Sequence, residues 1–230
     1  MPNIAENLKH IQNKIHEAEK RAGRAENSVR LVAVSKFHPS QSVIEAVEAG
    51  QTLFGENRIQ EASAKFDEIR EQGIACDLHI IGSLQRNKVK EAVRIARCIE
   101  SVDRIELLEE IEKQAAKINK NIEILFEVHT GEDSKAGFTS QEELENAIKL
   151  CAEQKFPHIT PRGFMTMAPF TEDKDLIRKS FVTLRNLRDS FQKKYPSLDL
   201  SELSMGMSGD FEIAIEEGAT IVRIGTAIFG

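Results

Sequence analysis

Short, apolar, β-branched segments alternate with amphipathic segments along almost the whole chain. The segment 30–36, RLVAVSK, is an apolar run of the kind that is buried on both faces of a parallel sheet. The region 4–22 instead repeats apolar residues at three- and four-residue spacing, which predicts a helix with one buried stripe. This alternation restricts the chain to α/β architectures built on a parallel sheet.

Eight segments fit strands and eight fit helices. We expect strands at 30–36, 52–57, 77–82, 98–103, 122–129, 162–167, 200–206 and 220–225. We expect helices at 4–22, 40–49, 57–72, 86–97, 104–118, 140–154, 173–194 and 209–217. Three glycines stand where glycines end helices, namely Gly50, Gly73 and Gly218. Three residues are candidate N-caps, namely Ser40, Asp103 and Ser140.

The β/α unit repeats about every 25–30 residues, and no Pro/Gly/Ser-rich linker interrupts it. This favours one (β/α)8 TIM barrel domain over residues 1–230, with an extra N-terminal helix. An open, doubly wound sheet is the alternative. In a barrel, functional sites lie at the C-terminal ends of the strands, and phosphate sites follow strands seven and eight. Chemistry is therefore expected at the strand ends.

Composition excludes several classes of partner. With 31 basic and 37 acidic side chains the formal charge is −6, which argues against nucleic acid. No apolar run approaches the roughly 18 residues that span a bilayer, and the charged N-terminus lacks the apolar core of a secretory signal. The three cysteines are widely spaced and predict neither disulfides nor a zinc site. We expect a cytoplasmic protein with free thiols, no metal and no membrane segment.

Lys36 ends the first predicted strand and so lies at the barrel mouth. Low dielectric there disfavours the ammonium form and frees the amine as a nucleophile. A lone lysine at a strand end is more often an ordinary surface residue, so the hypothesis needs support from elsewhere.

The last two β/α units supply that support. Small residues lead from strand seven into a helix, where unpaired N–H groups and hydroxyls form anion sites; they are Ser204, Gly206, Ser208 and Gly209. Strand eight ends beside them at Gly225 and Thr226. Because strands eight and one are neighbours in a closed barrel, the predicted phosphate cradle adjoins Lys36.

Other strand ends add polar groups. Glu56 and Asn57 end the second strand, and His79 lies within an apolar run, where a core histidine is favoured over a catalytic one. Gln85 and Lys88 fit a site and a solvated surface equally well.

Two methionines alternate along the sixth strand. At least one of Met165 and Met167 is expected to fill the barrel or cover a flat ligand, with core packing favoured.

Several motifs together resemble one family. They are VAVSK (32–36), FGENRIQE (54–61), HIIGSLQRNK (79–88), GFMTM (163–167), SMGMSGD (204–210) and RIGTAIFG (223–230). In order and spacing they closely resemble the pyridoxal phosphate homeostasis protein family, whose members are related to the N-terminal barrel of alanine racemase. The resemblance covers nearly the whole chain.

The resemblance implies a role for each site residue. Lys36 corresponds to the Schiff-base lysine, Arg223 to the residue facing the pyridine nitrogen, and Asn57 to a neighbour of the ring. The implied phosphate contacts are Ser204, Ser208, Gly209, Gly225 and Thr226. His129 stands where the family usually has asparagine, so no role is transferred to it. Relatives also commonly continue for several residues beyond the position of Gly230.

The function implied is binding of pyridoxal 5′-phosphate (PLP) in intracellular vitamin B6 homeostasis. The expected partners are PLP, small amines or amino acids, and PLP-dependent apoenzymes that receive the cofactor; we expect a monomer. Robust catalysis is not expected, because the only tyrosine, Tyr195, lies far from the strand ends. A weak PLP-dependent amino-acid racemase is the first alternative. A cofactor-free Schiff-base aldolase is the second.

Overall fold

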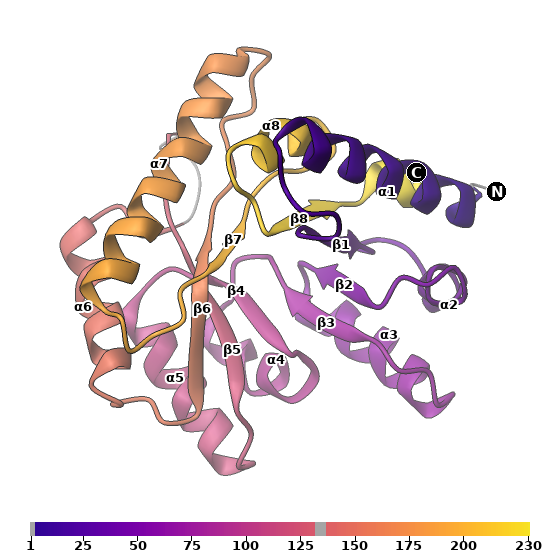
Figure 1. Ribbon diagram of the computed structural model, residues 1–230. Coiled ribbons are helices and arrows are strands. Elements are labelled where there is room, and N and C mark those ends of the chain that lie inside the picture. The colour runs from indigo at the N-terminus through magenta and orange to yellow at the C-terminus, as the bar shows by residue number, and fades with distance from the viewer. Residues whose placement is uncertain (1–2, 132–136) are drawn as a thin grey trace.

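The computed structural model describes residues 3–131 and 137–230. Eight parallel strands follow one another around a closed barrel, and the last pairs with the first (Figure 1). The strands are β1 (Arg30–Val34), β2 (Leu53–Glu56), β3 (Asp77–Ile80), β4 (Cys98–Val102), β5 (Ile122–Glu127), β6 (Ile159–Met165), β7 (Glu202–Ser204) and β8 (Ile221–Ile224). The predicted barrel is confirmed. The open-sheet alternative is wrong, because Arg30 to Ala33 pair in register with Ile221 to Ile224.

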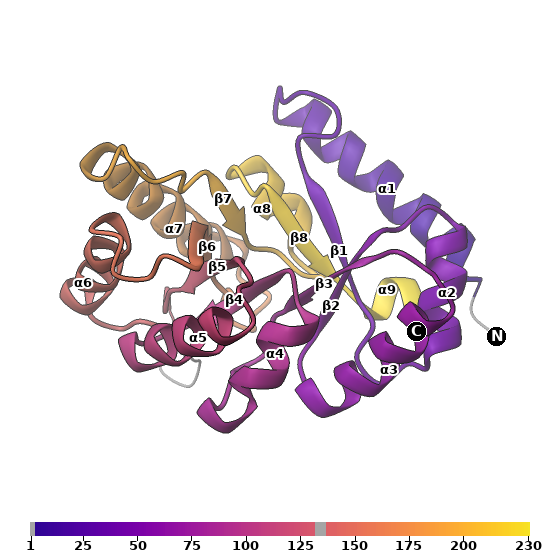
Figure 2. The ribbon, with the colours of Figure 1, turned by 90° about the horizontal axis from the view of Figure 1, so that it is seen from below.

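Helices surround the strands (Figure 2). They are α1 (Ile4–Arg21), α2 (Ser40–Glu48), α3 (Ile59–Glu71), η1 (Arg86–Lys88), α4 (Val89–Ile95), α5 (Ile105–Lys117), α6 (Gln141–Ala152), α7 (Lys174–Lys194), α8 (Phe211–Glu216) and α9 (Thr226–Phe229). Among the described helices, none is long and apolar enough to cross a membrane. The predicted stop glycines Gly50, Gly73 and Gly218 have φ of 94°, 74° and 98°, as helix-ending glycines require.

The extra N-terminal helix α1 covers the barrel where β8 meets β1. The helices nearest this seam in sequence, α8 and α9, span only 6 and 4 residues. α1 packs against both of them and against α2, with its apolar stripe buried. Asn7 Nδ2 donates to the carbonyl oxygen of Ile228 at 2.9 Å. α1 thus provides the outer layer that a full-length helix after β8 would otherwise form.

Strand residues alternate between the barrel interior and the outer helical layer. Leu31 and Ala33 of β1 belong to the large cluster beneath the helices. Val32 and Val34 belong to a smaller interior cluster with Cys98, Leu125, Met165 and Ile221. β1 ends at Val34, which also lines the cavity at the barrel mouth.

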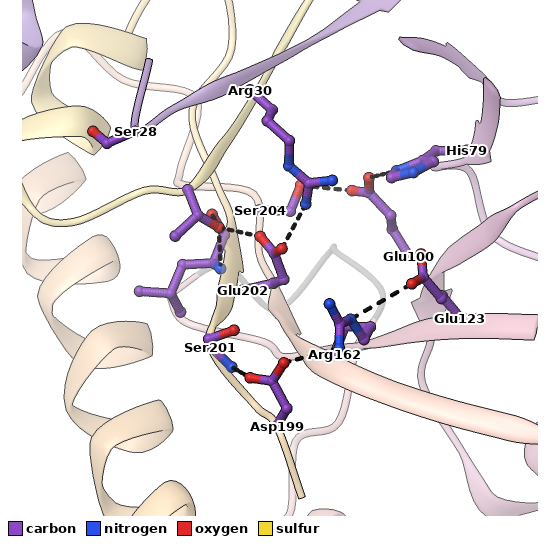
Figure 3. Close-up of polar contacts among 12 residues, drawn as sticks. Ser28, Arg30, His79, Glu100, Glu123, Arg162, Asp199, Ser201, Glu202 and Ser204 are labelled. Atoms are coloured by element: carbon purple, nitrogen blue, oxygen red, sulfur yellow. Dashed lines mark hydrogen bonds and ion pairs between the residues drawn. The ribbon is translucent and has the colours of Figure 1, made fainter. Parts of the chain in front are cut away.

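Ion pairs close the N-terminal ends of the strands (Figure 3). Arg30 on β1 contacts Glu202 on β7 at 2.6 Å. Arg162 on β6 lies 3.6 Å from Glu123 on β5 and 2.8 Å from Asp199. These cations are paired with protein carboxylates, so the functional site is sought at the opposite end.

Several predicted boundaries were wrong. The sixth strand begins at Ile159, before Pro161, and not at residue 162. Proline cannot donate to a sheet and is tolerated at irregularities; here the β5–β6 register shifts between Ile124 and Leu125, next to the partner of Pro161. The helix predicted at 86–97 begins with the 3₁₀ turn η1 before α4.

Two of the three predicted N-caps were displaced by one residue. Pro39 precedes α2 in extended conformation, so Ser40 is the first helical residue. Arg104, not Asp103, occupies the N-cap of α5. Ser140 is confirmed, since its hydroxyl accepts from the backbone N–H of Glu143 at 3.3 Å.

The cysteines behave as predicted for free thiols. Cys98 and Cys151 are buried and Cys76 is half-buried, and none forms a disulfide. Burial raises the pKa of the Cys151 thiol to about 12, which keeps it protonated. The described residues contain no cluster of three metal-ligating side chains.

Candidate functional site

A cavity of about 460 Å³ opens at the C-terminal ends of the strands. Its walls include Val34 at the end of β1, Ile81 after β3 and Met167 after β6. Seven predicted site residues line it, namely Lys36, Asn57, Ser208, Gly209, Arg223, Gly225 and Thr226. Residues far apart in the sequence therefore meet where the barrel topology predicts.

Lys36 lies in the turn after β1, two residues beyond the last strand residue, and not within the strand as predicted. Ser35 anchors this turn: its N–H donates to the carbonyl of Gly55 at 3.1 Å, and its carbonyl accepts from the N–H of His38, also at 3.1 Å. Phe37 follows with φ of +69°, a conformation that non-glycine residues rarely adopt. The chain therefore turns sharply just after Lys36, so that the lysine stays at the cavity.

A buried ion pair supports the same turn from outside the barrel. Lys65 Nζ on α3 lies 2.7 Å from Glu56 Oε1 and donates to the Ser35 carbonyl at 2.8 Å. The Ser35 hydroxyl also donates to Glu56 Oε1, at 2.7 Å. Sequence reasoning missed Lys65. Its position on the apolar face of α3, beside Ala62 and Ile69, is the signal that could have found it.

The loop before α8 and the first residues of α9 form a cradle of unpaired donors. Within the described part of the chain, no protein acceptor receives the backbone N–H of Ser208, Gly209, Thr226 or Ala227. The hydroxyls of Ser208 and Thr226 are likewise exposed and have no hydrogen-bonded partner among the described residues. Converging N–H and hydroxyl groups of this kind bind anions. Unpaired donors are thus available at the position where the phosphate cradle is predicted.

Two glycines give this cradle its shape. A Cβ atom built on Gly209 would meet nothing within 4 Å, so it would project into open space. A Cβ atom on Gly225 would lie 2.9 Å from the carbonyl oxygen of Val34. Glycine at position 225 therefore lets the end of β8 approach the end of β1 and brings the cradle beside the Lys36 turn.

Arg223 reaches the cavity from inside the barrel. Its side chain is buried, with Nη1 donating to Ser204 Oγ at 2.7 Å and Nη2 to the carbonyl of Thr166 at 2.8 Å. Burial lowers the pKa of the guanidinium, while the carboxylates of Glu100, Glu127 and Asp210 act in the opposite direction.

Ser204 differs from its predicted role. It is fully buried and does not line the cavity. Its hydroxyl donates to Glu100 Oε2 at 2.6 Å while accepting from Arg223. Because its hydroxyl is engaged by the side chains of Glu100 and Arg223 and Ser204 does not line the cavity, we do not include it in the proposed phosphate cradle.

Arg223, Ser204 and Glu100 form a series of hydrogen bonds that continues to His79 inside the barrel. His79 Nδ1 lies 2.6 Å from Glu100 Oε1, and Figure 3 shows both side chains beside Ser204. His79 does not line the cavity, in agreement with the favoured interpretation as a core histidine. Sequence reasoning missed Glu100; a charged residue inside the strand CIESV is the signal that could have found it.

Glu127 ends β5 and is another group that sequence reasoning missed. Burial raises the pKa of its carboxyl to about 7, helped by Asp103 and Glu100 and opposed by Arg223. Its Oε2 atom is buried without a hydrogen-bond partner in the described structure. A carboxyl in this setting is half protonated near neutral pH.

The remaining candidates divide between the cavity and other places. Asn57 lines the cavity, and Gly82 packs against it so closely that an added Cβ would lie 2.6 Å from the Asn57 carbonyl oxygen. Met167 lines the cavity, whereas Met165 fills the barrel interior, as expected for one of the two. Three residues lie outside the cavity, namely Gln85, Lys88 and Tyr195.

Tyr195 ends α7, on the outer layer of the molecule. Its hydroxyl lies 3.2 Å from Glu145 Oε1 on α6, within hydrogen-bond distance. This agrees with the prediction that it is remote from the strand ends.

Comparisons with known proteins agree with this geometry. The family described as "Alanine racemase, N-terminal domain" matches residues 6–230. A pyridoxal phosphate homeostasis protein from Aquifex aeolicus is 40% identical over 228 residues, covering 99% of this chain and 98% of the relative. The structure of PipY from Synechococcus elongatus, described with PLP bound, is 34% identical, has a TM-score of 0.87 and is covered over 100% of its length.

Alanine racemase from Clostridium difficile shares the fold alone. It is 16% identical with a TM-score of 0.76, and this chain covers 56% of it. The barrel is thus common to both, whereas the near-complete match in length is to the homeostasis proteins. The chain belongs to the alanine racemase N-terminal domain family and, within it, to the pyridoxal phosphate homeostasis proteins.

Proposed function

We propose that this protein binds PLP in the cavity, as a Schiff base on Lys36, and takes part in intracellular PLP homeostasis. One observation supports the proposal above all: Lys36 and a cradle of unpaired N–H and hydroxyl groups line the same cavity. PLP carries an aldehyde that condenses with amines and a phosphate that needs such donors. The names of the relatives and the PLP-bound PipY structure point to the same ligand.

Each wall of the cavity would have a separate part in binding. The N–H groups and hydroxyls of Ser208, Gly209 and Thr226 would hold the phosphate, with Gly225 providing the space for it. Asn57 would lie beside the ring. Arg223 would face the ring nitrogen, where its positive charge opposes protonation. That arrangement weakens the ring as an electron sink, which suits racemase-type chemistry or no carbanion chemistry at all.

The racemase alternative receives less support. Racemisation needs proton carriers on both faces of the substrate carbon. Lys36 can serve one face, but no tyrosine is among the described cavity-lining residues, and Tyr195 is bonded to Glu145 elsewhere. The aldolase alternative is not favoured either, because the relatives are named for pyridoxal phosphate homeostasis and the PipY structure is described with PLP bound.

The remaining parts of the proposal concern surroundings and partners. We propose a monomeric, single-domain cytoplasmic protein that exchanges PLP with small amines or amino acids and passes it to apoenzymes. We propose no nucleic-acid partner, because a formal charge of −6 disfavours binding to a phosphate backbone.

The test is an absorbance spectrum of the protein with PLP, followed by borohydride reduction and peptide mapping. We expect a visible band and a covalent label on the peptide containing Lys36. Lys36→Ala should abolish the label. Lys88 follows a strand but lies outside the cavity, so Lys88→Ala should retain the label. Labelling of Lys88, or of Lys135, which lies outside the described residues, would refute the assignment.

A further inference from the structure

We propose that Glu100 is a positioning residue for Arg223: acting through Ser204 from beneath the cavity, it fixes the guanidinium and sets the charge that Arg223 presents to the ligand. The inference rests on the proposed function where it concerns PLP. Its structural part, the hold on Arg223, can be tested without any ligand.

The hydrogen bonds that link Arg223, Ser204 and Glu100 have fixed directions. A guanidinium can only donate, so Arg223 Nη1 donates to Ser204 Oγ at 2.7 Å. The Ser204 proton is then free to donate to Glu100 Oε2, at 2.6 Å. His79 lies 2.6 Å from the other carboxylate oxygen. Glu100 is therefore the common acceptor, and removing its charge weakens each link above it.

Burial increases the effect of losing any one of these hydrogen bonds. Glu100 and Ser204 are 0% exposed and Arg223 is 4% exposed, so water does not replace a lost partner. Burial by itself would raise the pKa of Glu100, but the hydrogen bonds with His79 and Ser204 and the charge of Arg223 hold it below its ordinary value. Glu100 is therefore an anion at neutral pH.

The charges around Arg223 come from several elements. Glu100 Oε2 on β4 lies 3.9 Å from Nη1, and Glu127 on β5 and Asp210 before α8 also act on the guanidinium. The carboxyl of Glu127 has a pKa of about 7 and is only partly ionised at neutral pH. Glu100 is thus the buried anion closest to Arg223 along this hydrogen-bonded chain. Without it the cavity floor becomes more positive.

The ligand-free test measures exchange of the Arg223 guanidinium protons with water by NMR, with the resonance assigned by its loss in Arg223→Lys. We expect slow exchange in the wild type and at least roughly tenfold faster exchange in Ser204→Ala and in Glu100→Gln. Glu19→Gln is the control, because Glu19 is a buried glutamate on α1 that caps residues 27–29. It should destabilise the fold without changing the exchange of Arg223. Wild-type exchange in both site variants would overturn the proposal.

The second test uses the PLP-loaded protein. A unit charge at about 10 Å through an effective dielectric of about 20 shifts a titration by about one pH unit. Since positive potential disfavours a protonated imine, Glu100→Gln should lower the pH midpoint of the visible band by about that amount. Ser204→Ala retains the carboxylate and should shift the midpoint less.

The outcomes separate the two proposals. A wild type with no visible band would refute the proposed function. The NMR result would then still decide whether Glu100 and Ser204 fix the Arg223 guanidinium. A bound cofactor whose midpoint is unchanged in Glu100→Gln would overturn the electrostatic part of the inference. If Glu100→Gln does not fold, exchange in Ser204→Ala alone decides the positional part.

Discussion

At the scale of single residues, Lys36 and Arg223 are two basic side chains that line one cavity, and they differ in how firmly the protein holds them. Both terminal nitrogens of Arg223 are bonded to protein acceptors. The described residues offer no hydrogen-bond acceptor to Lys36 Nζ, which lies 5.9 Å from the Phe37 ring centroid. The backbone of the Lys36 turn is fixed, whereas its amine is available. This combination suits a reactive amine beside a fixed charge.

The cradle hydroxyls provide the first prediction. Ser208→Ala combined with Thr226→Ala removes two donors to a charged oxygen, each worth roughly 1.5–3 kcal/mol. PLP affinity, measured by titrating the visible band, should fall at least about tenfold. The control is Ser201→Ala combined with Thr183→Ala, which removes two exposed hydroxyls elsewhere. Unchanged affinity in the cradle variant would place the phosphate at another position.

Glu127 provides a prediction about pH and stability. The pKa of its carboxyl is about 7 in the folded protein against an ordinary value of 4.5. A raised pKa gives stability that is present below 4.5 and lost as pH rises through 7. Between pH 4.5 and 8 the wild type should lose about 3 kcal/mol relative to Glu127→Gln, which does not titrate there.

Urea unfolding at both pH values measures this difference. Glu106→Gln, at an exposed glutamate on α5, should show no comparable change with pH. A constant difference between the wild type and Glu127→Gln would mean that folding does not raise the pKa of Glu127.

At the scale of elements, the helices differ in how their N-termini are held. Asp173 caps α7 by accepting the N–H groups of Asp175 at 2.9 Å and Leu176 at 3.2 Å. Pro39 and Arg104, at the N-caps of α2 and α5, provide no side-chain hydrogen bond. These two helices therefore depend more on packing against the strands than on capping.

The third prediction concerns α7, which packs against β6 and β7. Asp173→Ala leaves two helix N–H groups without their side-chain acceptor and should lower the free energy of unfolding by about 1 kcal/mol. Glu172→Ala, at the exposed neighbouring position, is the matched control and should change stability little. Equal losses in both variants would argue against a capping role.

At the scale of the whole molecule, closure of the barrel joins segments that are distant in the sequence into one unit. β8 pairs with β1, and α1 packs on α8 and α9, so both ends of the chain contribute to the same seam. Figure 1 shows α1 and the C-terminal helix α9 near one another at this seam. Loss of either end should therefore disturb the entire barrel.

The fourth prediction follows from this closure. Urea unfolding should be one transition, with far-UV circular dichroism and the fluorescence of the single tyrosine, Tyr195, changing together. PLP at about 100 times its Kd should add about 2.7 kcal/mol of stability, and Lys36→Ala should reduce this gain at the same PLP concentration. Separate transitions for the two probes would indicate more than one cooperative unit.

Local pattern was sufficient to predict the strands, most of the helices and the part of the cavity wall formed by the Lys36 turn and the loop before α8. The end of an apolar strand placed Lys36 at the barrel mouth, and small residues before a helix marked the predicted cradle at Ser208 and Gly209, because both signals depend on neighbours in sequence. Errors arose where local signals were ambiguous. Pro161 concealed the start of β6, and Ser204 resembled Ser208 until its side chain was seen to face the barrel interior.

The sequence by itself thus determined the fold class, the order of the elements and the end of the barrel at which the site lies. Only the tertiary structure showed that Glu100, Ser204 and Arg223 form one buried chain, and that Lys65 supports the Lys36 turn. Glu100 and Ser204 are separated by 104 positions and Lys65 and Ser35 by 30. The physical reason is that such pairs are created by strand register and helix packing around a closed barrel, and no local propensity encodes them.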